Sequence, residues 1–93
     1  MNAVVTKNTD RSRYELHIEG RLVGVADYRV AGDVVVFPHT EITPPLRGRG
    51  LAAQLVREAL DDVRSSRRSV DPQCWYVAQF IDDNPEYGDL LAA

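Results

Sequence analysis

The sequence predicts an α/β (α+β) domain in which a mixed, mainly antiparallel sheet of about five strands is covered by one long helix, with a short helix near the C-terminus. Alternating apolar and polar residues, broken at glycine-containing turns, fill roughly the first forty residues. Apolar residues then recur at helical spacing after Pro44-Pro45. With 93 residues the chain is too short for a second core, so we expect one domain over residues 1–93.

The first part of the chain is expected to form an antiparallel meander. Turns at Glu19-Gly20-Arg21 and Ala31-Gly32-Asp33 separate successive strands, because glycine can adopt the backbone angles of a tight hairpin. The run Val34-Val35-Val36-Phe37 is apolar without alternation, which indicates burial on both faces and a central place in the sheet. The four predicted strands cover residues 3–7, 13–19, 21–30 and 33–42.

A long helix is predicted to cover the sheet. Its interior contains neither Pro nor Gly, and Arg64, Arg67 and Arg68 near its end suit the negative end of the helix dipole. We expect it to end near Ser69. The apolar positions that define its buried side, over about four turns, are 51, 52, 55, 56, 59, 60 and 63.

One more strand and a short helix are expected after the turn Asp71-Pro72-Gln73. Residues 74–77 are rich in strand-forming side chains, and residues 78–83 resemble a helical turn that Asn84-Pro85 stops. The order strand, helix, strand implies a crossover, which places the last strand parallel to the fourth.

Composition and charge exclude several functional classes. The 44% hydrophobic and 27% charged content is that of an ordinary globular domain, and a net charge of −3 argues against a general nucleic-acid binder. No apolar run approaches the ~20 residues of a membrane span. Residues 1–7 lack the features of a secretory leader, so we expect a cytoplasmic protein. The single cysteine, Cys74, excludes an intrachain disulfide framework and cannot by itself make a structural zinc site, and we expect no metal.

Basic residues gather in one segment of this acidic chain. Residues 44–68 contain six arginines and three acidic residues, whereas residues 71–93 contain five acidic residues and no Lys or Arg. A local basic patch on an acidic protein suits a small polyanionic ligand.

The segment from Arg47 to Ala52 lies between the fourth predicted strand and the long helix. The first amides of a helix have no intrahelical acceptor and form a site for phosphate, and Gly48 and Gly50 let a ligand approach the backbone. The segment lacks the Gly-Lys-Ser/Thr ending of a P-loop, and it follows a meander rather than opening a dinucleotide-binding unit. The alternative is a tight connection without a ligand.

The pattern Arg47-x-x-Gly50-x-Ala52 resembles the Arg/Gln-x-x-Gly-x-Gly/Ala signature of GNAT acetyltransferases in the same strand-loop-helix setting. Residues 39–42 and Cys74 further resemble a compact GNAT-like group, and the resemblance covers residues 34–87. It implies a GNAT-like fold that binds acetyl-CoA or coenzyme A. It also implies pantetheine contacts at Ile42 and Thr43, and a pyrophosphate site at Arg47, Gly48, Arg49, Gly50, Leu51 and Ala52.

Three side chains are candidates for the chemistry that this resemblance implies. His39 and Glu41 alternate with Thr40, so both point to one face of the strand near the expected thioester, where either could act as a base. If residues 74–77 lie beside the fourth strand, the thiol of Cys74 comes within reach of His39 and could become a nucleophile. The alternatives are an exposed carboxylate, a hydrogen-bonding histidine and a buried structural cysteine.

The resulting prediction is a transferase that moves an acetyl or short acyl group from CoA to an amine, either a small molecule or a protein. One alternative is an acetyl-CoA-binding protein with little or no transferase activity and slow thioester hydrolysis at most. Another is an interaction module whose Arg47-Gly48-Arg49-Gly50 contacts phosphate of a protein or RNA. A monomer and a homodimer are both compatible with the sequence, because the first strand could pair with a copy of itself.

Overall fold

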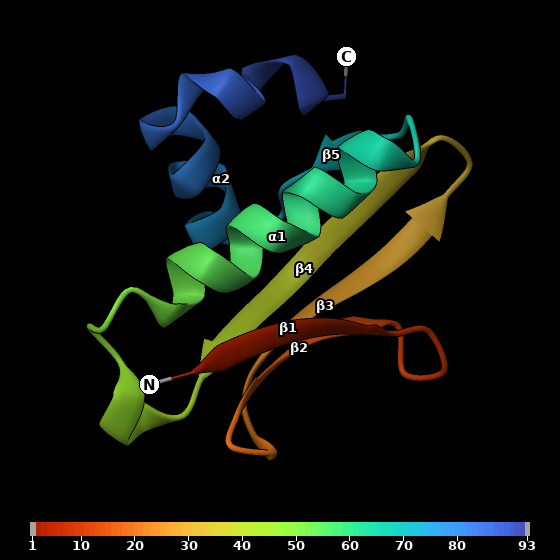
Figure 1. Cartoon of the computed structure of the whole chain (residues 1–93). Coiled ribbons are helices and arrows are strands. Elements are labelled where there is room, and N and C mark those ends of the chain that lie inside the picture. The colour runs from red at the N-terminus through yellow and green to blue at the C-terminus, as the bar shows by residue number, and fades with distance from the viewer. Residues whose placement is uncertain (1, 93) are drawn as a thin grey trace.

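The computed structural model of the chain describes residues 2–92 and shows a five-stranded sheet with helices packed against one face (Figure 1). The strands follow one another across the sheet in chain order. They are β1 (Ala3–Asn8), β2 (Arg13–Ile18), β3 (Arg21–Ala31), β4 (Val34–Ile42) and β5 (Ser69–Asp71). The helical elements are η1 (Pro44–Leu46), α1 (Leu51–Ser65), α2 (Trp75–Asp83) and η2 (Pro85–Leu90). The predicted mixed sheet is therefore confirmed.

The first four strands form the predicted antiparallel meander, and β4 pairs with β5 in parallel. Gly20 and Gly32 form the hairpin turns with φ of 78° and 62°, in the left-handed region that favours glycine. In β4, Val35, Val36 and Phe37 are all buried, as their continuous apolar run predicts. At Val35 and Val36, β4 pairs with β3 on one side and with β5 on the other.

Helix α1 buries one apolar stripe against the sheet, and it contacts all five strands. The helix ends at Ser65, so the prediction of an end near Ser69 is wrong. The chain leaves the helix through Arg67, which has a positive φ of 59°, and Ser69 already belongs to β5. The buried residues of the stripe are Leu51, Leu55, Val56, Ala59, Leu60 and Val63.

The predicted strand at residues 74–77 is also wrong. The fifth strand is Ser69–Asp71, and Cys74 is the N-cap of α2. The buried side chains Val77, Phe80 and Ile81 recur at helical spacing, and this packing outweighs the strand propensity of the aromatic residues before them. Among residues 2–92, none of the helices is long and apolar enough to span a membrane.

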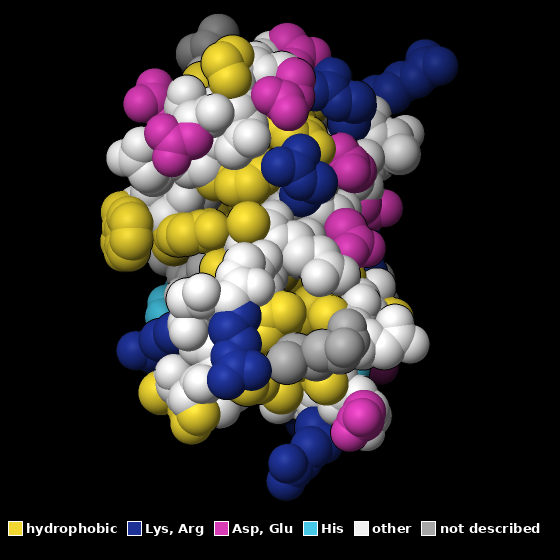
Figure 2. Space-filling model, turned by 60° about the vertical axis from the view of Figure 1, so that its left-hand side comes forward, with side chains coloured by type: hydrophobic (Ala, Val, Ile, Leu, Met, Phe, Trp, Pro, Cys, Tyr) yellow, Lys and Arg dark blue, Asp and Glu magenta, His cyan; other side chains and the backbone are white. Residues whose placement is uncertain are grey.

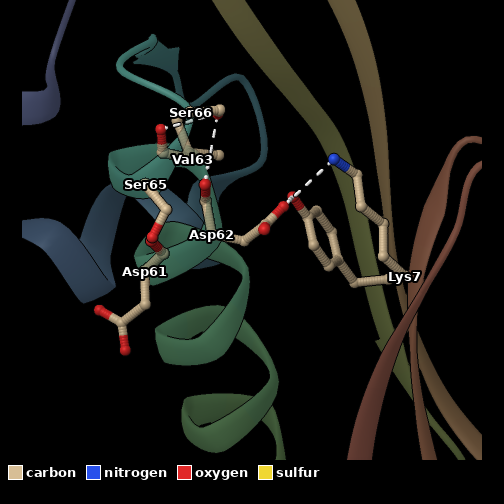
Figure 3. A network of polar contacts seen from close by, with 7 residues as sticks. Lys7, Asp61, Asp62, Val63, Ser65 and Ser66 are labelled. Carbon is tan, nitrogen blue, oxygen red and sulfur yellow. Dashed lines mark hydrogen bonds and ion pairs between the residues drawn. The ribbon is translucent and has the colours of Figure 1, made fainter.

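A polar network connects the C-terminal half of α1 to the edge of the sheet. Figure 3 shows Lys7 reaching from β1 toward Asp62, and the Lys7 Nζ to Asp62 Oδ2 distance is 3.1 Å. The hydroxyl of Tyr14 donates to the same carboxylate at 2.7 Å. Burial raises the pKa of Tyr14 well above its ordinary value, and the hydrogen bond to Asp62 adds to this shift. The network therefore favours the neutral phenol in the folded protein.

Tyr14→Phe is expected to destabilise the protein by about 1–2 kcal/mol at pH 7, because Asp62 loses a buried donor. The raised pKa also predicts that wild-type stability falls as the pH rises past about 10, where tyrosine ionises in the unfolded chain but Tyr14 stays protonated in the fold. Urea unfolding between pH 8 and 11 measures both effects. The variant should lose less stability over this range, and Tyr28→Phe serves as the control. Equal pH dependence of Tyr14→Phe and wild type would contradict the prediction.

Candidate functional site

The connection between β4 and α1 is shaped by two glycines and one arginine. Gly48 and Gly50 have φ of 80° and 78°, and Gly50 is the N-cap of α1. The side chain of Arg47 folds back so that its Nε donates to the carbonyl oxygen of Ile42 at 3.0 Å. This contact holds the start of the loop against the end of β4.

The N-terminal end of α1 is open to a ligand. The amides of residues 51–53 have no acceptor within the helix, whose first such bond runs from Gln54 N to the carbonyl of Gly50 at 3.1 Å. Gly50 has no side chain that could cap these amides, and the first turn contains no acidic residue. Outward-facing amides, the helix dipole and nearby arginines are the features that favour an anion at the start of a helix.

A cavity of about 490 Å³ lies between this loop, β4 and the first residues of α2. Its volume is within the usual range for small-molecule sites. Figure 2 shows the face that includes the loop, where hydrophobic side chains gather next to basic ones. Of the predicted site residues, Thr43, Arg49 and Cys74 are not among those that line the cavity. The lining consists of His39, Thr40, Glu41, Ile42, Leu46, Arg47, Gly48, Gly50, Leu51, Ala52, Ala53, Trp75 and Tyr76.

The edge of β4 beside the cavity is open because β5 is short. The last β4–β5 pair is Val36 with Asp71, and the amide of Cys74 donates to the carbonyl of Phe37 at 2.8 Å. Beyond this point, no strand among residues 2–92 pairs with the backbone groups of β4 on that side. An extended ligand can bind to such an edge.

The pairing of β4 with β3 shows which backbone groups face this open edge. The amide of Thr43 donates to the carbonyl of Val23 at 2.8 Å and is therefore directed toward β3. Because backbone groups alternate in direction along an antiparallel strand, those of Ile42 and Thr40 are directed toward the cavity. The bond from Arg47 to the Ile42 carbonyl agrees with this assignment. Thr40 was not among the predicted site residues, because alternation along a sequence does not indicate which edge of a strand is free.

His39 and Glu41 share one face of β4, as predicted. They lie opposite Asp27 and Val25 of β3, whereas Thr40 and Ile42 lie opposite Ala26 and Gly24 on the face that packs against the core. The Nε2 atom of His39 is 3.2 Å from Oε1 of Glu41, and the two side chains are 54% and 59% exposed. They form an exposed acid-base pair at the cavity wall.

Cys74 lies on the other face of the sheet from this pair. Its side chain is buried, and its Sγ is 3.6 Å from the hydroxyl oxygen of Thr40. The structure thus pairs the thiol with Thr40 and the imidazole of His39 with Glu41. No cluster of three or more His, Cys, Asp or Glu residues that could hold a metal occurs among residues 2–92.

Gly24 is a further residue that the site requires. A Cβ atom at this position would lie 2.5 Å from Cδ1 of Ile42 and 3.3 Å from the carbonyl oxygen of Glu41. The missing side chain therefore makes room for Ile42, which lines the cavity. A glycine inside an alternating strand pattern signals such a close approach in the sequence.

Known structures share this fold. A GCN5-like protein from Staphylococcus aureus, solved by NMR, superposes with a TM-score of 0.74 and 15% identity, covering 97% of this chain and 88% of that protein. The ribosomal-protein-S18-alanine N-acetyltransferase from Escherichia coli superposes with a TM-score of 0.67 and 14% identity, covering 77% of this chain and 50% of the enzyme. At these identities the similarity establishes the fold alone.

Sequence comparison identifies the family. The chain is 31% identical to mouse Protein NATD1 over 84 residues, which cover 87% of this chain and 76% of that protein. It is 33% identical to bovine Protein NATD1 over 78 residues, covering 81% and 68% of the two chains. The family model of the GCN5-related N-acetyltransferases matches residues 13–90, a stretch that includes the whole cavity lining. The chain belongs to the GCN5-related N-acetyltransferase (GNAT) family.

Proposed function

We propose that this protein transfers an acetyl or short acyl group from CoA to an amine. The observation that carries the proposal is the continuity of one cavity from the open end of α1 to the open edge of β4. The pyrophosphate would bind to the free amides at the start of α1, on Gly48, Gly50, Leu51 and Ala52, with the charge of Arg47 and Arg49 nearby.

The pantetheine arm would lie along the free edge of β4. Its amides can pair with the outward-directed backbone groups of Ile42 and Thr40, in the manner of an added strand. Thr43 remains a proposed contact through its side chain, because its amide is bonded to β3. With the pyrophosphate at the start of α1 and the arm running from Ile42 back along β4, the thioester would reach Thr40 and Cys74.

The exposed pair of His39 and Glu41 is proposed to act as the base. The amine nitrogen attacks the thioester carbonyl carbon, the carbon-sulfur bond breaks, and the proton of the amine passes to the pair. The departing CoA thiolate then takes up a proton from solvent, and the pair returns the proton of the amine to solvent. Because the pair lies on the uncovered face of the sheet, an amine can approach it from solvent while the acyl-CoA lies along the open edge of β4.

A covalent route through Cys74 is the alternative chemistry. The thiol would give its proton to the departing CoA sulfur while its own sulfur takes the acyl group, and the amine would then attack this new thioester. The contact of the thiol with Thr40 instead of an imidazole favours direct transfer.

Thermal unfolding with acetyl-CoA, CoA and ADP tests the proposal. A ligand that binds the native state raises the melting temperature, so both CoA forms should stabilise the protein, and ADP should do so less. Intact mass after exposure to acetyl-CoA should show no adduct on Cys74 if transfer is direct. An adduct would establish the covalent route, and no stabilisation at millimolar acetyl-CoA would refute the acyl-CoA site.

The second candidate function is acyl-CoA binding with slow thioester hydrolysis at most. It is favoured by the exposure of more than half of both His39 and Glu41, which leaves few side chains to enclose an acceptor. Release of CoA that no member of a panel of primary amines accelerates would support this function over transfer.

We further propose that the protein works in the cytoplasm as a single domain, monomeric or homodimeric. One cluster of buried side chains extends from Tyr14 to Leu90, which supports one domain. The single, unpaired cysteine is compatible with a reducing compartment.

A further inference from the structure

Two aromatic side chains form the wall of the cavity opposite the loop between β4 and α1. Trp75, the only tryptophan of the chain, is the first residue of α2 and is 76% exposed. Tyr76 packs edge-on against it, with ring centroids 5.7 Å apart at an interplanar angle of 79°. Both residues line the cavity.

The exposure of Trp75 is exceptional in this molecule. The other exposed large hydrophobic side chains of residues 2–92 are aliphatic, are 44–50% exposed, and do not line this cavity. An indole has the largest apolar surface of any side chain, so its exposure costs the free protein more than that of a leucine or valine. A ligand that covers the indole would recover this free energy.

The point at which the start of α2 meets β4 indicates which part of the ligand Trp75 would cover. The loop meets β4 at Ile42, where Arg47 bonds to the carbonyl. The start of α2 meets β4 farther back, where Cys74 bonds to Phe37 and contacts Thr40. Thr40 and Phe37 precede Ile42 by two and five residues, which corresponds to roughly 7 Å and 16 Å along a strand. Trp75 therefore lies beside the route of the pantetheine arm and away from the anion site.

We propose that Trp75 is a positioning residue that packs over the pantetheine and thioester arm of bound acyl-CoA. The inference rests on the proposed function and adds a residue that neither the phosphate site nor the base requires. The indole covers the open side of the arm, opposite the edge of β4, and Tyr76 supports the ring. By restricting the motion of the arm, Trp75 holds the thioester carbonyl close to the part of the cavity wall formed by His39 and Glu41.

Intrinsic fluorescence reports on this contact directly, because Trp75 is the only tryptophan. Acetyl-CoA and CoA should shift the emission to shorter wavelength and protect the indole from acrylamide quenching. ADP, which has the pyrophosphate but no arm, should leave both signals unchanged at concentrations that stabilise the protein thermally. Equal protection by ADP and CoA would overturn the proposal, as would CoA binding without any change in fluorescence.

Substitution gives a second, independent measurement by calorimetric titration. Trp75→Ala should weaken binding of acetyl-CoA and CoA about tenfold and leave ADP binding unchanged, because only the arm loses its cover. Trp75→Phe should recover most of the affinity. Leu91→Ala removes an exposed apolar side chain outside the cavity and is the matched control. Unchanged CoA affinity in Trp75→Ala would overturn the inference and leave the proposed function standing, whereas absence of CoA binding to wild type would refute both.

Discussion

Gly50→Glu is expected to abolish stabilisation by acetyl-CoA and CoA while the protein stays folded. Apart from its two chain neighbours, no heavy atom of residues 2–92 lies within 4 Å of the position where the new Cβ would be, so the first carbon of the new side chain meets no steric obstacle. The φ of 78° costs a non-glycine residue about 1–2 kcal/mol. The carboxylate would lie at the free amides of α1, where it would occupy the anion site and repel a pyrophosphate. We expect the CoA affinity to fall by about a hundredfold or more, measured by calorimetric titration.

Gly20→Glu is the matched control for this substitution. Gly20 has the same φ of 78° and the same free space around its Cβ position, but it lies in the hairpin between β2 and β3. Both variants should therefore lose similar stability, and only Gly50→Glu should lose CoA binding. Wild-type CoA affinity in Gly50→Glu would mean that the start of α1 is not the pyrophosphate site.

Glu41→Gln is expected to lower kcat/KM by roughly 10²–10⁴-fold, the range for loss of a general base. Binding of acetyl-CoA should change little, because glutamine keeps the size of the side chain and the arm is proposed to bind to backbone groups at the edge of β4. Initial rates of CoA thiol release with a panel of primary amines measure the first effect, and titration with acetyl-CoA measures the second.

Glu58→Gln replaces an exposed carboxylate of α1 that does not line the cavity, and it should keep the wild-type rate. Cys74→Ala should also remain active if transfer is direct. The opposite pattern, with full activity in Glu41→Gln and none in Cys74→Ala, would replace the His39 and Glu41 pair by a cysteine nucleophile.

The sequence predicts the meander and the long helix because local signals agree there. Gly20 and Gly32 mark the turns, and the apolar period marks the buried side of α1. The region after α1 is harder to predict, since β5 has three residues and Val70 alone provides an apolar signal. Trp75 and Tyr76 favour strands as residue types, but the helix they begin is stabilised by packing of Phe80 and its neighbours against the core. The helical spacing of the buried residues in α2 spans little more than one turn, which is too short to outweigh the strand preference in the sequence.

The part of the candidate site that depends on neighbouring residues in the sequence could be predicted, and this part is the loop before α1. Gly48 and Gly50 adopt the left-handed angles that their place in the loop suggests. The relation of Cys74 to β4 was not predictable, because the register between β3 and β4 shifts near Asp27 and Arg29. Because of this irregularity, Thr40 lies with Cys74 on the core face of β4, and His39 lies on the opposite face. Unbroken alternation would have placed His39 on the same face as Phe37, which is in the core.

The shortness of β5 has a consequence for how this fold can diversify. Because β5 stops at Asp71, the far wall of the cavity is made by side chains at the start of a helix and not by a hydrogen-bonded ladder. Substitutions at Trp75 and Tyr76 can therefore alter the width and chemistry of that wall while every strand pairing is kept. Trp75 in particular is exposed and lies outside the buried core, so this part of the wall can change with little effect on the packing between α1 and the sheet.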